Sequence, residues 1–208
     1  LHSFHSRRDS DLHNLSMDPD NWQKWQKIVA LGMLVNVNYS YVAENEAALI
    51  ANASKLNNAL VSGSVLANYR GEGWKIVWGP GLINDQKVTS GSGTGWVSVN
   101  AMFVAEGKDP ITGKKMYVLA VAATNQVSQT DWVVEDLNVV QTSAWTPVDN
   151  ASIKAGVISQ GTRIGLTNLL ALRDPNSGMD VLTFLRGLSR DESVEIAVTG
   201  ASLGGALS

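Results

Sequence analysis

Apolar positions in the first 70 residues repeat with the period of helices. The first such stripe has spacings of three or four residues and consists of Trp22, Trp25, Val29 and Met33. This spacing predicts a helix that begins near residues 18–20 and presents these side chains on one apolar face. The same spacing predicts a second helix within residues 44–60. We therefore expect N-terminal helices over residues 21–70, preceded by a polar leader or tail at residues 1–20.

From residue 71 onward the pattern becomes that of strands. Apolar residues stand at every second position within residues 74–78 and again within residues 97–105, which predicts two half-buried strands. Residues 116–123 are almost continuously apolar, as is typical of a central strand covered on both faces. A turn at residues 107–113 returns the chain from the second of these strands into the third.

The last third of the chain contains segments with helical periodicity and a segment with the alternation of a strand. Helices are predicted at residues 131–137, within residues 152–172 and at residues 180–188, and a strand is predicted at residues 193–199. A glycine-rich turn follows that strand. This order predicts an α/β fold with a mostly parallel sheet and helices on both faces, and we assign residues 71–208 to this core.

Composition and charge exclude several classes of function. The 208 residues carry a net charge of −3, so no broad basic surface indicates a nucleic-acid partner. Without cysteine the chain has no disulfide, no thiolate metal site and no cysteine nucleophile. No cluster of histidines and carboxylates has metal-ligand spacing, and we expect no metal and no cofactor. The most apolar stretch, residues 28–37, is far shorter than the roughly 20 residues of a membrane-spanning helix.

A candidate nucleophile lies near the end of the sequence. Residues 200–204 match the G-x-S-x-G pattern, in which a sharp strand-to-helix turn holds a serine in strained backbone geometry. The residues two positions away must then be small, and Gly200 and Gly204 meet that need. The hydroxyl of Ser202 stands clear of the sheet, and the amide of Leu203 points to the same place, where it can bind an oxyanion.

Two sequence blocks resemble one family. Residues 198–207, VTGASLGGAL, resemble the V-T-G-H-S-L-G-G-A-L block of class 3 (fungal-type) lipases, which are α/β-hydrolases. Residues 121–137, VAATNQVSQTDWVVEDL, are similar to the upstream V-R-G-T-N-P-x-S-x-x-D-W-x-x-x-D-L block of the same family. The resemblance covers residues 73–208. It departs from the family pattern at Ala122, Ala123 and Ala201.

The resemblance implies a serine ester hydrolase, a lipase or carboxylesterase whose partner is a lipid or small ester substrate. It implies that Ser202 is the nucleophile and that Leu203 and Thr124 supply the oxyanion hole. It also implies that the segment after Thr124 forms a lid that excludes water from the acyl site. The apolar contacts of that lid are Val127, Trp132, Val133 and Leu137. Core packing is the simpler interpretation of Trp132 and Leu137.

The acid–base partners of the serine are expected outside this chain. In α/β-hydrolases the order is Ser, then Asp or Glu, then His. The six residues after Ser202 are neither acidic nor histidine, and the three histidines lie within the first 13 residues. We therefore expect the Asp–His pair downstream of residue 208, and little or no turnover from these 208 residues alone.

Two alternatives remain open at this point. One is a hydrolase-like module that binds a lipid or a partner without catalysis, as the alanines at 122, 123 and 201 favour. The other is a dinucleotide loop, because residues 198–204 also resemble the T-G-x-x-x-G-x-G turn of short-chain dehydrogenases. That interpretation is weakened by Ala206 at the final glycine position and by the long chain that precedes the turn.

Overall fold

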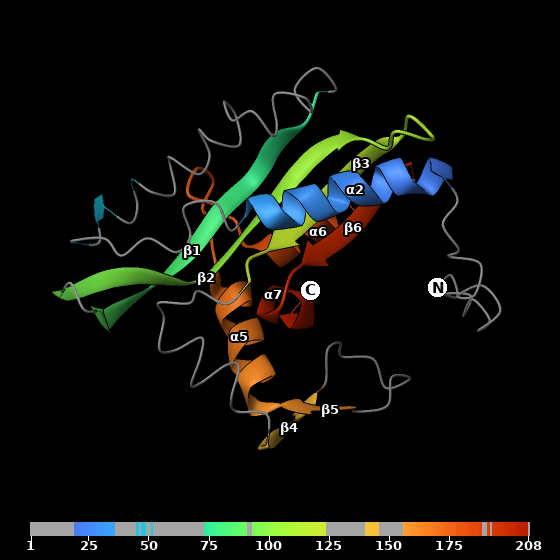
Figure 1. The fold of residues 1–208 in the computed structure, drawn as a ribbon. Helices are drawn as coiled ribbons and strands as arrows, with labels where there is room; N and C mark the ends of the chain where they lie inside the picture. The colour runs from blue at the N-terminus through green and yellow to red at the C-terminus, as the bar shows by residue number, and fades with distance from the viewer. Residues whose placement is uncertain are drawn as a thin grey trace.

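The computed structural model describes residues 19–35, 45, 47–48, 51, 73–90, 93–123, 140–145, 156–188, 191 and 193–207. Four strands form a sheet in the order β1-β2-β3-β6 (Figure 1): β1 (Lys75–Ser90), β2 (Gly93–Lys108), β3 (Lys115–Val121) and β6 (Glu195–Gly200). Among the described helices, α2 (Pro19–Leu34) covers one face of this sheet. Of the same described set, α5 (Gln160–Ala171), α6 (Val181–Leu188) and α7 (Leu203–Leu207) pack on the other face. A separate hairpin joins β4 (Thr142–Trp145) to β5 (Gly156–Ser159).

The sheet is mixed, with helices on both faces, and is compatible with an α/β fold. The expectation of a mostly parallel sheet is wrong for the described strands, because β1–β2 and β2–β3 are antiparallel and only β3–β6 is parallel. The reason is the length of the connections. Two residues separate β1 from β2 and six separate β2 from β3, whereas a parallel pair needs a crossover of a dozen or more residues. Of these three connections, only the one between β3 and β6 is long enough for the crossover that a parallel pair requires.

Alternation along β2 and β3 divides the core into two clusters. On the α2 side, Phe103, Val118 and Ala120 are fully buried beneath Ile28 and Leu31 of the helix. On the opposite side a second set packs against α5, α6 and α7, including Met102, Val104, Tyr117 and Val121. Burial on both faces explains why residues 116–123 read as continuously apolar.

The position of α2 confirms the first predicted helix but corrects the face that it buries. The predicted apolar stripe of Trp22, Trp25, Val29 and Met33 is 47–57% exposed. The face against the sheet is instead formed by Ile28, Leu31, Leu34 and the following Val35. Gly32 permits the close approach, because a Cβ there would lie 2.8 Å from Oγ1 of Thr199 on β6. Both stripes have helical spacing, so periodicity alone does not tell which one is buried.

The later predicted elements are confirmed where the structure describes them. The helices predicted within residues 152–172 and at residues 180–188 are α5 and α6, and the strand at residues 193–199 is β6. Residues 1–18, most of the second predicted helix and the helix predicted at residues 131–137 lie outside the described residues. Among the described helices, none is both long and apolar enough to cross a membrane.

A buried carboxylate anchors the connection between α5 and α6 to the sheet. Asp174 accepts hydrogen bonds from the backbone N–H of Gly79 at 2.9 Å and from the N–H and hydroxyl of Ser177 at 2.8 and 2.6 Å. The indole N–H of Trp78 donates to the carbonyl of Met179 at 2.9 Å. Burial by itself raises the pKa of Asp174, but the hydrogen bonds from Ser177 and Gly79 outweigh it and lower that pKa.

A second charged cluster ties α2 to two parts of the sheet. Nζ of Lys24 lies 3.0 Å from Oδ2 of Asp109, at the start of the β2–β3 turn, and also pairs with Glu195 at the start of β6. The carboxylate of Asp109 is 1% exposed and accepts the N–H groups of Ile111 and Thr112 at 2.8 and 3.3 Å. Burial alone raises the pKa of Asp109. The hydrogen bonds from Ile111 and Lys24 outweigh burial and hold that pKa well below its usual value.

Replacing Lys24 by methionine is expected to lower the free energy of unfolding by about 2–4 kcal/mol at pH 7, because the buried Asp109 carboxylate loses its cation. Since the folded-state pKa of Asp109 is depressed, this stabilisation is present above about pH 4 and is lost as the pH falls. Urea unfolding at pH 7 and pH 3 measures both effects. The control is Lys75→Met, which breaks the exposed Lys75–Glu106 pair at a cost of less than about 1 kcal/mol. Equal losses for both variants contradict the prediction.

Candidate functional site

The candidate site lies where β6 ends and α7 begins. β6 runs parallel to β3, with Gly200 opposite Val121, so both strands end at the same edge of the sheet. Residues 201 and 202 form the turn, and Leu203 begins α7. The strand–turn–helix order predicted for the G-x-S-x-G segment is therefore present. It brings Ser202 to the carboxyl end of the parallel pair, where α/β proteins commonly bind ligands.

The backbone of Ser202 is in the left-handed region, with φ of 53°. Among the described residues it is the one non-glycine residue with positive φ. This conformation costs an L-residue roughly 1–2 kcal/mol, so the surrounding packing must hold it in place. The N–H of Gly205 donates to the carbonyl of Ser202 at 2.9 Å and closes the turn. The side chain of Ser202 itself is exposed.

Close packing of glycines holds the turn against two strand ends. A Cβ on Gly200 would lie 2.3 Å from the carbonyl carbon and oxygen of Gly204. A Cβ on Gly204 would lie 2.3 Å from the carbonyl oxygen of Ala122 and 2.5 Å from that of Val121. The first turn of α7 thus rests directly on the backbone of β6 and on the end of β3. Neither glycine has room for a side chain.

Two leucines of α7 pack in the core and hold the turn in place. Leu203 is 7% exposed and Leu207 is 6% exposed, and both belong to the same buried cluster as Leu169 of α5. The side chain of Leu203 therefore points into the core, while its amide lies next to Ser202 in the chain. A fixed amide beside an exposed hydroxyl is the arrangement that can bind the oxyanion of an acyl-transfer reaction.

The fold brings the two sequence blocks together at this point. Ala122, from the first block, contacts Gly204 of the second through its backbone, and its N–H donates to the carbonyl of Ala101 at 2.9 Å. Thr124 follows two positions later and lies outside the described residues. The predicted lid contacts Val127, Trp132, Val133 and Leu137 lie outside them as well. The three histidines of the sequence also fall outside the described part of the chain.

The side chain of Ala122 occupies a position that the family pattern gives to arginine. It is 5% exposed and belongs to the buried cluster beneath α2. The methyl group of Ala122 therefore occupies this buried position instead of a charged side chain. Ala201, at the position of the family's histidine, is half-buried.

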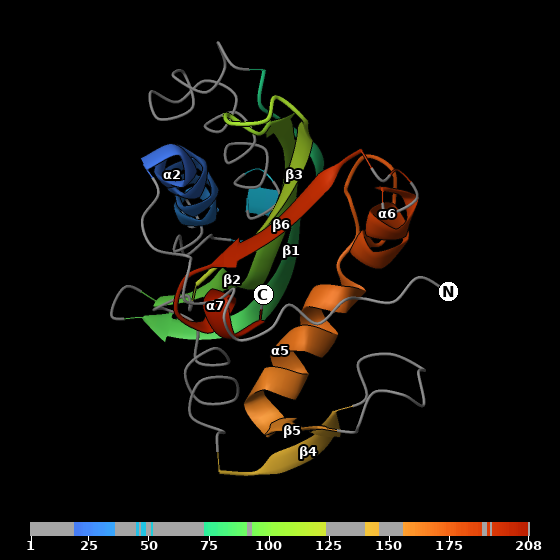
Figure 2. The same ribbon diagram turned by 90° about the vertical axis from the view of Figure 1, so that its right-hand side faces the viewer.

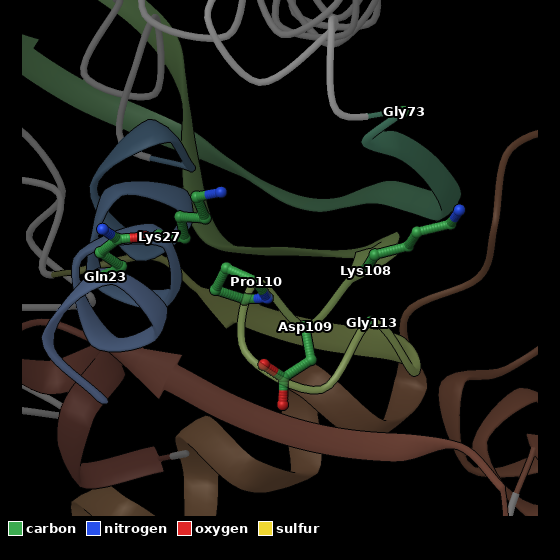
Figure 3. Close-up of a pocket in the computed structure, with 7 residues that line it drawn as sticks. All are labelled: Gln23, Lys27, Gly73, Lys108, Asp109, Pro110 and Gly113. Carbon is green, nitrogen blue, oxygen red and sulfur yellow. The ribbon is translucent and has the colours of Figure 1, made fainter. Parts of the chain in front are cut away.

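A separate hollow of about 650 Å³ lies between α2 and the β2–β3 turn (Figure 3). Its lining is Gln23, Lys27, Gly73, Lys108, Asp109, Pro110 and Gly113. The carboxylate of Asp109 is turned away from Lys27 and Lys108 and is bound by Lys24. This hollow adjoins the amino end of β3, roughly 20 Å from the Ser202 end at 3.3 Å per strand residue. Sequence reasoning missed it because its residues come from distant segments, and it is not part of the Ser202 site.

Comparisons with known proteins find a similar fold among solved structures. No family model matches the sequence, and no curated protein matches it. Among solved structures, the crystal structure of M37 lipase is similar to this chain, with a TM-score of 0.58 and 28% sequence identity. The similarity covers 87% of this chain and 50% of that one, so this chain spans about half the length of M37 lipase. The comparison supports a lipase-like fold.

Proposed function

We propose that this chain carries the nucleophile half of a serine ester hydrolase, a lipase or carboxylesterase of the class 3 type, with Ser202 as nucleophile. The observation that chiefly supports this is the positive φ of Ser202 at a strand–turn–helix junction. The positive φ places the exposed Ser202 in a sharp turn between a strand and a helix, which is the backbone geometry that presents a nucleophilic serine above a sheet. The lipase-like fold of the chain and the G-x-S-x-G pattern support the same assignment.

The proposed reaction proceeds through an acyl-enzyme. Oγ of Ser202 attacks the ester carbonyl while a histidine base accepts its proton, and the amides of Leu203 and Thr124 stabilise the oxyanion. The tetrahedral intermediate expels the alcohol, which takes the proton from the histidine. Water then hydrolyses the acyl-serine by the same steps and releases the carboxylic acid. The histidine and its carboxylate partner are expected downstream of residue 208.

A lid over this site is part of the proposal. The segment after Thr124 would close over the acyl group through Val127, Trp132, Val133 and Leu137, which shields the intermediate from bulk water. The exposure of Ser202 supports a site that needs such a cover. The substrate class is a lipid or small carboxylic ester, and the reaction requires no cofactor.

A fluorophosphonate probe tests the assignment, because it reacts only with an activated serine. In the protein made from a reading frame that continues past residue 208, we expect one labelled peptide, which contains Ser202. Ser202→Ala is expected to abolish the labelling. The 208-residue chain alone is expected to label at a rate reduced by about 100-fold or more, because the base is missing. A label on another residue, or an unchanged label in Ser202→Ala, contradicts the proposal.

A non-catalytic hydrolase-like module is the second candidate. It is favoured by alanine at positions 122, 123 and 201, where the family pattern has larger or more specialised residues. Absence of fluorophosphonate labelling in a folded, longer protein would favour this module. The dinucleotide interpretation lacks comparable support, because β6 follows three other strands of its sheet, whereas a dinucleotide loop follows the first strand of its domain.

A further inference from the structure

Asn100 is a buried polar residue on β2. Within the described part of the chain, the buried polar or charged residues are Asp109, Asp174 and Asn100. Asp109 and Asp174 each accept hydrogen bonds from backbone N–H groups and so hold a turn in place. Asn100 is 3% exposed, and its neighbours Val99 and Ala101 are buried apolar residues. A carboxamide in such surroundings lowers stability unless it is hydrogen-bonded, so its place in the fold indicates what it binds.

The register of the sheet places Asn100 beside the end of β3. β2 and β3 are antiparallel, and the N–H of Ala122, one residue beyond β3, still donates to the carbonyl of Ala101 at 2.9 Å. One further step in this register places Asn100 opposite Ala123. Opposite residues next to a hydrogen-bonded pair approach each other most closely, with Cβ atoms about 4.5–5.5 Å apart. The carboxamide of Asn100 is therefore within reach of the backbone around Ala123.

Alternation along both strands puts Asn100 on the same face of the sheet as α7. Met102 lies two residues after Asn100 on β2, and Val121 lies two residues before Ala123. Both belong to the cluster that packs against α5, α6 and α7. Side chains two positions apart on a strand share a face. Asn100 and Ala123 thus lie on the face opposite α2, which Figure 2 shows on one side of the sheet with α6 on the other.

Both amides of the proposed oxyanion hole belong to this corner of the sheet. Gly204 rests on the carbonyl oxygen of Ala122, so the start of α7 with the amide of Leu203 lies against the end of β3. The other proposed amide is that of Thr124, the residue after Ala123. This N–H belongs to the planar peptide unit that joins the two residues, so a group that fixes that plane also fixes the direction of the N–H.

We propose that Asn100 is a positioning residue of the ester hydrolysis: its buried carboxamide hydrogen-bonds the backbone at residues 123–124 and so aims the Thr124 amide at the oxyanion. The carboxamide suits this role because it has two N–H donors and one acceptor oxygen and carries no charge. At 3% exposure Asn100 acts through the backbone and not on the substrate. The inference rests on the proposed function, since it requires the Thr124 amide to stabilise an oxyanion.

Three variants test this role. Asn100→Val and Asn100→Thr form a matched pair, because the two side chains have nearly the same shape and only threonine keeps a hydrogen-bonding hydroxyl. Both are β-branched and suit a strand, so the fold is expected to be retained. Val104→Ala is the control for lost packing. Val104 is buried on the same strand and the same face, about 13 Å farther from the site at 3.3 Å per residue.

The first readout is the mobility of the Thr124 amide in the 208-residue chain, measured by ¹⁵N relaxation. In the unchanged chain we expect an order parameter of about 0.85, as in rigid backbone. Asn100→Val is expected to lower it to about 0.6 or less, because the backbone at residues 123–124 loses its hydrogen bond. Asn100→Thr is expected to recover part of this loss, and Val104→Ala is expected to leave the order parameter unchanged.

The second readout is ester hydrolysis by the protein made from a reading frame that continues past residue 208, with kcat expressed per titrated active site. Asn100→Val is expected to lower kcat about 10- to 100-fold and to leave KM within about twofold, because a misdirected donor weakens binding of the transition state more than that of the substrate. Asn100→Thr is expected to recover part of kcat. Val104→Ala is expected to lower the Tm but to keep kcat, which is also the result that a merely structural Asn100 would give.

The proposal requires both readouts to move. An unchanged order parameter, an unchanged kcat, or a rise in KM at constant kcat in Asn100→Val overturns it, as does an equal loss of kcat in Val104→Ala. Its failure is distinguishable from failure of the proposed function. Fluorophosphonate labelling of Ser202 with unchanged kcat in Asn100→Val overturns the positioning role alone. Absence of labelling in the longer protein overturns the proposed function, and with it any role of Asn100 in catalysis.

Discussion

Ser202→Ala in the protein made from the continued reading frame is expected to lower kcat for hydrolysis of a p-nitrophenyl ester by about 10⁴-fold or more. In the proposed mechanism, the alanine removes the atom that would form the acyl-enzyme but leaves in place the amides proposed to bind the oxyanion. KM is therefore expected to change little. Stopped-flow or steady-state ester hydrolysis measures kcat, and circular dichroism shows that the variant remains folded.

The matched control for this variant is Ser193→Ala. Ser193 is an exposed serine just before β6, and its hydroxyl donates to the carboxylate of Asp191 at 2.6 Å. It belongs to the same strand–turn–helix unit but lies at the opposite end of β6 from the turn. The control is expected to keep kcat within about twofold, since it touches neither the turn nor the amides proposed to bind the oxyanion. Full activity in Ser202→Ala would remove Ser202 from the mechanism.

Gly204→Ala is expected to lower the free energy of unfolding by about 3 kcal/mol, because its Cβ would lie 2.3 Å from the carbonyl oxygen of Ala122. That atom belongs to the backbone at the end of β3, which cannot rotate away as a side chain can. Relief requires α7 to move off the sheet, and Leu203 and Leu207 then lose part of their burial. Urea unfolding followed by tryptophan fluorescence measures the loss.

Gly187→Ala is the comparison for the glycine prediction. Gly187 lies in α6, and a Cβ there meets nothing within 4 Å. This substitution is expected to stabilise the protein by about 0.5–1 kcal/mol, because alanine has the higher helix propensity. Opposite signs at the two glycines would show that the close approach at Gly204, and not glycine content in general, decides the stability. A neutral Gly204→Ala would mean that α7 does not rest on β3.

The glycine and serine pattern at the end of the chain illustrates what sequence reasoning reaches. The G-x-S-x-G spacing predicted a turn with small residues on both sides of Ser202, and the structure has that turn with φ of 53° at Ser202. Such a turn is local, so a few neighbouring residues specify it. The roles of Ser202, Leu203 and Thr124 in catalysis stay predictions that rest on the family resemblance.

Whether neighbouring strands run parallel or antiparallel was harder to predict, because it depends on the length of the connections and not on the residue pattern within the strands. Alternation identified the strands, but the same alternation suits parallel and antiparallel neighbours. The six-residue connection between β2 and β3 already allowed only a hairpin, and the predicted turn at residues 107–113 agreed with that. The general α/β order of the last third led to the expectation of a mostly parallel sheet.

By itself, the sequence determined the local elements: the helix at α2, the apolar β3 and the turn at Ser202 each follow from spacing within a few residues. Only the tertiary structure decided which stripe of α2 is buried. The stripe that contains Ile28 and the stripe that contains Trp25 both have helical spacing, and only one face of the helix can pack on the sheet. Only the tertiary structure brought Ala122 onto Gly204 and Lys24 onto Asp109. These contacts join residues more than 80 positions apart in the chain, and their partners are chosen by packing against a shared core, which no local pattern encodes.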